Sequence, residues 1–72
     1  MKAIIYLEKE TLSIEATSIE MNAGVSIWAK MSTENMRLAF HYARVAGIEA
    51  VEIYDYDICF QFPVATQMTI MA

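Results

Sequence analysis

His41 and Cys59 are the only histidine and the only cysteine in the chain, and together they could perform nucleophilic chemistry. An imidazole beside a thiol can act as the general base that activates it. However, Cys59 falls in an alternating run that predicts a strand, and His41 falls on the polar stripe of a predicted helix. If that helix packs on a sheet through its opposite face, the two side chains point apart. We therefore predict no catalytic residue and interpret the pair as an exposed histidine and a strand cysteine.

Four carboxylates lie close together in the sequence, at Glu49, Glu52, Asp55 and Asp57. Paired carboxylates can perform acid–base chemistry or bind a hard cation. A calcium loop needs ligands at alternate positions and a glycine for its sharp turn, and this run has neither the length nor the glycine. We therefore predict no metal site here and expect a solvated strand edge followed by a polar turn. A functional alternative is a negative surface that docks on a basic site of a partner.

Arg37, His41 and Arg44 recur at helical spacing and form one polar stripe, with Lys30 nearby in the sequence. A basic helix face can contact phosphates, and this stripe is therefore a candidate for weak nucleic-acid binding. The commoner fate of such a stripe is a solvated outer helix face. A third interpretation joins the two charge patterns, because the stripe of one copy could meet the acidic strands of another in a self-complementary dimer.

Composition excludes several other sites. One cysteine cannot form an internal disulfide, and one Cys with one His cannot supply the four ligands of a structural zinc. With Gly24 and Gly47 as the only glycines, no glycine-rich phosphate loop can be written, and we predict no cofactor. A formal net charge of −4 disfavours contact with nucleic-acid phosphates and anionic lipid. No apolar run is long enough for a signal peptide or a membrane span, and a lone thiol indicates a reducing cytoplasm.

Apolar periodicity predicts the elements that would position these residues. Alternation with a period of two predicts strands, which turn residues or short polar runs separate. The predicted strands cover residues 2–8, 12–21 (with a bulge near Ser18), 25–31, 48–54 and 58–62. Turns are predicted at Asn22-Ala23-Gly24 and at Asp55-Tyr56-Asp57, and Pro63 either ends the strand before it or marks a sheet edge. Residues 64–72 are predicted to form either a short last strand or a tail.

One amphipathic helix is predicted over Thr33–Ala46. Ser32 is suited to be the N-cap, and Gly47 is suited to the left-handed position that follows a helix. Met36, Phe40 and Ala43 recur on one face, opposite the basic stripe. The end signals and the internal period agree, which makes this helix the firmest element of the predicted fold.

These elements predict one α+β domain that spans residues 1–72. We expect a small antiparallel or mixed β-sheet of four to six strands in the order β-β-β-α-β-β, with the helix packed on one face. The far face would carry Tyr6, Trp28, Tyr54 and Tyr56, and an exposed aromatic patch commonly marks an interface. The composition agrees, because 57% hydrophobic residues with a mean hydropathy of +0.34 exceed what one small core can hide.

Three functional hypotheses follow. The first is a small non-enzymatic interaction protein, acting as a homodimer or as an adaptor or inhibitor that docks on a larger protein. In its sharper form, an acidic surface would block a nucleic-acid-binding site. The second is a ligand-binding protein or enzyme with a helix–sheet pocket formed by His41, Tyr42 and Cys59, and the third is weak nucleic-acid binding through the basic stripe. The candidate interaction residues are Trp28, Arg37, His41, Arg44, Glu49, Glu52, Tyr54, Asp55, Tyr56 and Asp57.

Overall fold

The computed structural model describes residues 1–22 and 26–72, and it contains one helix and seven strands. The elements are β1 Lys2–Tyr6, β2 Thr11–Glu15, β3 Ser18–Asn22, β4 Ser26–Lys30, α1 Thr33–Ala46, β5 Glu49–Tyr54, β6 Asp57–Gln61 and β7 Gln67–Met71. The α+β class is confirmed, and of the two alternatives left open for residues 64–72 the structure has the strand. The turn predicted at Asn22-Ala23-Gly24 falls on residues 23 and 24, which lie outside the described residues.

The strands form two antiparallel sheets rather than one. A three-stranded sheet has the order β2-β1-β7, and a four-stranded sheet has the order β3-β4-β6-β5. The reason is that the run predicted as one strand over residues 12–21 divides between the two sheets. The Ala16 N–H donates to the carbonyl of Met1 in the three-stranded sheet, whereas the next amide, that of Thr17, donates to Lys30 at the end of β4. The chain therefore changes sheets where a bulge was predicted.

The helix was predicted with its correct bounds, Thr33–Ala46. The Ser32 hydroxyl accepts a hydrogen bond from the amide of Asn35 at 3.2 Å, which satisfies one of the free donors at the helix start. Gly47 ends the helix at φ 75°, in the left-handed region where glycine is favoured. No helix in the described part of the chain is long and apolar enough to cross a membrane.

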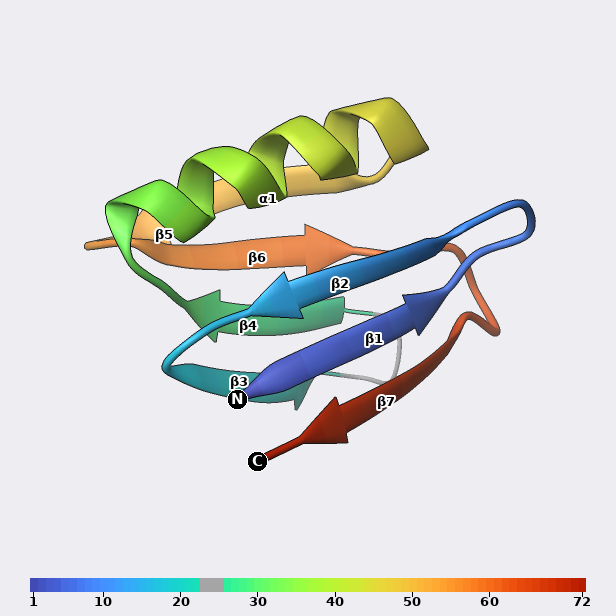
Figure 1. Cartoon of the computed structure of the whole chain (residues 1–72), viewed down its shortest axis with the longest axis horizontal. Helices are drawn as coiled ribbons and strands as arrows, with labels where there is room; N and C mark the ends of the chain where they lie inside the picture. The colour runs from blue at the N-terminus through green and yellow to red at the C-terminus, as the bar shows by residue number, and fades with distance from the viewer. Residues whose placement is uncertain (23–25) are drawn as a thin grey trace.

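The molecule has two layers around one core (Figure 1). The front layer holds the three-stranded sheet with α1 beside β2, and the four-stranded sheet lies behind both (Figure 1). Alternate residues of both sheets point into the space between the layers, where α1 adds the buried Ala39 and Ala43. The largest fully buried side chains are Phe60, Ile5, Ile14, Ile27 and Ile58. The helix thus takes the place of a fourth front strand.

This arrangement gives the molecule two sides on which edge strands of the two sheets face one another. Helix α1 packs against β2 and β5, which are the edge strands on one side, and we call this side the covered seam. The edge strands on the other side are β3 and β7, and we call this side the open seam. Within the described residues no helix covers the open seam (Figure 1).

Candidate functional site

Among the described residues, the edge of β7 at the open seam carries backbone groups without a partner. Met1 and Ala16 exchange two backbone hydrogen bonds, at 2.8 and 3.0 Å. This pair fixes the hydrogen-bonding pattern of β1: from Met1 onward, every second residue bonds to β2, and the residues between them bond to β7. The β7 partners of those intervening residues include Thr69, which pairs with Ile4. The N–H and C=O groups of Met68 and Ile70 therefore point away from the sheet. An exposed row of this kind can pair with another strand.

The side chains of the open seam are apolar and incompletely covered. Met68 and Ile70 lie opposite the fully buried Ile5 and Ala3, so they point into the core, yet they remain half-buried. Across the seam, Met21 of β3 faces the same way as the buried Ile27 but is 50% exposed. The core is therefore continuous with an uncovered apolar strip at this side.

Charge distinguishes β7 from the other edge strands. Glu20 lies on β3, Glu15 on β2 and Glu49 on β5, whereas Gln67–Met71 contains no charged residue. Charged side chains on edge strands commonly prevent two copies of a protein from pairing edge to edge. Strand β7 lacks this protection.

The outer face of the four-stranded sheet carries a second uncovered surface. Glu20, Trp28, Cys59 and Val51 are cross-strand neighbours in one row over β3, β4, β6 and β5. Trp28 is 38% exposed and Val51 is 49% exposed. We call this row, together with the flanking Glu49 on β5, the tryptophan face.

The predicted acidic and aromatic residues gather only in part on this face. Tyr54 and Asp57 are cross-strand partners next to it, and Tyr54 is 78% exposed. The turn that joins β5 to β6 holds Asp55 and Tyr56, both at positive φ, as hairpin turns require. Glu52 faces Ile58 instead and accepts a hydrogen bond from the Tyr56 amide at 3.0 Å. The predicted turn is confirmed, and it occupies one end of the face.

The basic stripe lies on the other side of the four-stranded sheet. Arg37, His41 and Arg44 are exposed on α1, which packs on the same core as the inner face of that sheet. Arg44 and Glu49 line one hollow of about 320 Å³ between α1 and β5. The stripe and the tryptophan face therefore lie on different sides of the four-stranded sheet and adjoin at Arg44 and Glu49.

The residues of the hypothetical ligand pocket are not brought together. Tyr42 lines two hollows between α1 and β2, of about 190 and 240 Å³, and its ring meets that of His41 edge to face at 5.5 Å. Cys59 lies on the outer face of the four-stranded sheet, because its neighbours Ile58 and Phe60 point into the core. Among the described residues, no group of three or more His, Cys, Asp or Glu side chains could hold a metal ion.

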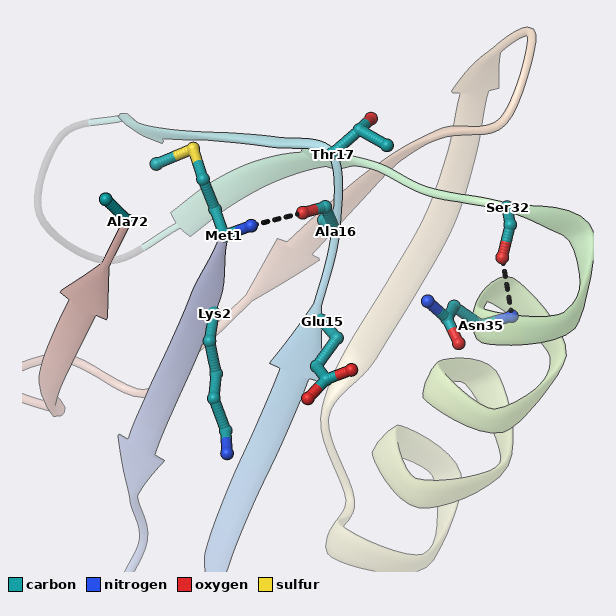
Figure 2. A pocket seen from close by; sticks show the side chains of 8 residues that line it. All are labelled: Met1, Lys2, Glu15, Ala16, Thr17, Ser32, Asn35 and Ala72. Carbon is teal, nitrogen blue, oxygen red and sulfur yellow. Dashed lines mark hydrogen bonds between the residues drawn. The ribbon is translucent and has the colours of Figure 1, made fainter.

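A larger hollow of about 390 Å³ lies where β1 begins, β2 ends and α1 starts (Figure 2). Its polar side chains are Lys2, Glu15, Thr17, Ser32 and Asn35. Both hydroxyls already have partners, since Ser32 caps the helix and Thr17 donates to the Lys30 carbonyl at 2.9 Å. The hollow is wide open to solvent, and nothing in it distinguishes one ligand class from another.

Comparison with protein-family models, with curated proteins and with solved structures gave no match. The candidate surfaces are therefore defined by this molecule's own geometry. The open seam was not predicted from sequence, although the absence of charge over residues 67–72 is a signal that could have indicated it.

Proposed function

We propose that this protein is a small non-enzymatic interaction module that forms a homodimer through the open seam. The observation that carries the proposal is the free β7 edge, in which Met68 and Ile70 combine unpaired backbone groups with half-buried apolar side chains. A cytoplasmic location belongs to the same proposal, supported by the single free thiol of Cys59.

Two β7 strands can pair with each other antiparallel about a twofold axis. With the axis at Thr69, Met68 of one copy faces Ile70 of the other, and the two such pairs would form about four backbone hydrogen bonds. The same pairing brings the inward side chains of both residues beside their counterparts. It therefore satisfies the free edge and covers the apolar strip in one step.

Electrostatics favours this edge over the other three. Each copy carries a formal net charge of −4, so two copies repel one another in general. Pairing along β3, β2 or β5 would bring Glu20, Glu15 or Glu49 close to its counterpart. Pairing along the uncharged β7 avoids this contact.

The size of the molecule sets how much surface must take part. A standard interface takes about 800 Å² from each partner, roughly a sixth of the 4726 Å² that this chain exposes. Strand β7 is too narrow to supply that area alone. We therefore expect the neighbouring exposed apolar residues, Met21 and Met71, to take part as well.

Light scattering during size exclusion, from low to high micromolar concentration, tests the proposal. The wild type is expected to change from monomer to dimer, and Met68→Lys to remain a monomer because it places a charge in the seam. Ser13→Lys is the matched control, because it makes the same charge change at an exposed position of β2, away from the seam. This variant should dimerise normally. A wild-type monomer at high micromolar concentration, or equal loss in both variants, would contradict the proposal.

Salt concentration separates this dimer from one held by the basic stripe and the acidic strands. Doubling the ionic strength weakens contacts between exposed charges and has little effect on apolar and backbone contacts. We expect the dimer to persist or strengthen slightly, because salt screens the repulsion between two negative copies. Dissociation in salt would favour the charge-paired arrangement instead.

A further inference from the structure

We infer that the tryptophan face is a docking surface for an arginine-bearing basic segment of a partner protein. This inference does not rest on the proposed dimer, because the face is the outer side of the four-stranded sheet, whereas the dimer uses the β7 edge and, from the four-stranded sheet, the inward-facing Met21. It assigns a second, heterologous surface to the molecule.

Trp28 sits on an inner strand of its sheet, with β3 on one side and β6 on the other. The Met31 amide donates to the Tyr56 carbonyl at 3.2 Å, and this bond shows which pairs between β4 and β6 are hydrogen-bonded. Because hydrogen-bonded and non-hydrogen-bonded pairs alternate along antiparallel strands, Trp28 and Cys59 form a non-hydrogen-bonded pair. Side chains of such pairs approach one another closely. The indole therefore lies in a continuous apolar row that ends at the exposed Val51.

Two carboxylates flank the apolar residues of this row, and neither forms an ion pair within the described residues. Glu20 is the direct cross-strand neighbour of Trp28, and Glu49 lies two residues from Val51 on the same side of β5. The one ion pair within the described residues joins Lys30 to Asp55, at 3.7 Å, and neutralises the far end of the face. The row is therefore an apolar strip with one carboxylate near each end.

Arginine is the side chain that fits this surface best. Its planar guanidinium can stack on an indole while it donates a pair of hydrogen bonds to a carboxylate, here that of Glu20. Its aliphatic stem can lie along the apolar row toward Val51. Lysine can match the charge but not the stacking, and polyanions such as nucleic acid are repelled.

Trp28 is the only tryptophan in the chain, so its fluorescence reports binding at this face directly. The probes are octa-arginine and octa-lysine peptides, titrated against the full-length chain at low ionic strength. We expect octa-arginine to change the emission saturably and to bind about two- to fivefold more tightly than octa-lysine, because the planar guanidinium can stack on the indole and pair with a carboxylate at the same time. Equal affinity for the two peptides, or no change in emission, would overturn the inference.

Charge variants separate a specific site from general attraction to an acidic protein. Glu20→Gln/Glu49→Gln is expected to weaken octa-arginine binding about tenfold. Glu8→Gln/Glu34→Gln makes the same net charge change at exposed positions outside the face, and it should weaken binding less than twofold. If both double variants lose equal affinity, the face is not a site.

Two further variants identify the occupant. Met68→Lys should bind octa-arginine as the wild type does, even though it should not dimerise. Loss of the dimer and loss of peptide binding can therefore be observed separately. The stripe of a second copy could also supply arginines to this face. If Trp28 emission depends on protein concentration, and Arg37→Gln/Arg44→Gln abolishes that dependence, the partner is a second copy and the inference is overturned.

Discussion

The covered seam and the open seam are two solutions to one problem, since each must close the gap between the edge strands of two sheets. At the covered seam, α1 lies over β2 and β5 and buries the small side chains of Ala39 and Ala43. At the open seam, Met68, Ile70 and Met21 point toward the core and remain partly exposed. The same core is thus closed by a helix on one side and left partly exposed on the other.

The residue types at the two seams match the difference in burial between them. Alanine lets a helix approach a sheet closely, because it adds little volume at the contact. Methionine is unbranched and adapts to irregular or changing surroundings, which suits a surface that is wet in one state and covered in another. This composition supports the proposal that the open seam is a contact surface rather than a packing defect.

The largest expected effect comes from placing the same charge at both seams. Ala43→Lys buries an ammonium where the native side chain is 1% exposed, and we expect a loss of about 3–5 kcal/mol in the free energy of unfolding. Met68→Lys can extend its ammonium to water, so we expect a loss of about 1 kcal/mol or less. Urea denaturation followed by circular dichroism, at a concentration where the chain is monomeric, measures both.

Equal losses of stability in the two variants would contradict this difference between the seams. They would mean that the open seam is as tightly closed in solution as the covered one. Ala43→Ser is a useful second variant, because it keeps the small volume and should leave a folded protein even where Ala43→Lys does not.

The covered seam also depends on how the chain leaves the helix. Gly47 has φ 75° and directs the chain into β5, and a Cβ at this position would meet no atom within 4 Å. Gly47→Ala should therefore destabilise through backbone strain alone, by about 1–2 kcal/mol. Gly47→Asn should cost less than Gly47→Ala, since asparagine tolerates the left-handed region. Identical midpoints for the two variants in urea would show that strain at this position is not the cause.

Local signals predicted the covered seam better than the open one. For α1, the cap Ser32, the apolar period and Gly47 all lie within one short stretch, so the element could be predicted with its bounds. For residues 12–21, buried positions shift from even numbers, ending at Ala16, to odd numbers, beginning at Ile19. A shift of one residue fits a bulge or a change of sheet equally well, and only the distant contact of Thr17 with Lys30 decides between them.

The candidate surfaces were predicted to the extent that they depend on alternation. Tyr6 and Trp28 were expected on one common sheet face, but Trp28 lies on the outer face of the four-stranded sheet and Tyr6 on the outer face of the other sheet. The open seam depends on the pairing of β1 with β7, which joins the two ends of the chain. No local pattern specifies a contact between such distant segments.

The smallest expected effect concerns the turn that leads into β7. The Thr66 amide donates to the Pro63 carbonyl at 3.2 Å, and Ala65 between them has φ 68°, a position that favours glycine in this kind of turn. Ala65→Gly should therefore raise the free energy of unfolding by about 0.5–1 kcal/mol, because relief of strain exceeds the added chain entropy. Thermal denaturation of the monomer measures the change.

Val64→Gly is the matched control for this turn. Val64 is 88% exposed and is not at positive φ, so glycine there removes little packing and adds only flexibility, which should lower stability slightly. Opposite signs for the two variants would show that β7 is held by a strained turn in an otherwise complete strand. If Ala65→Gly also strengthens the dimer, strain in the turn opposes pairing of β7. The affinity of the dimer is then limited by how well β7 holds its strand conformation. If the dimer is unchanged, its strength depends on the exposed side chains alone.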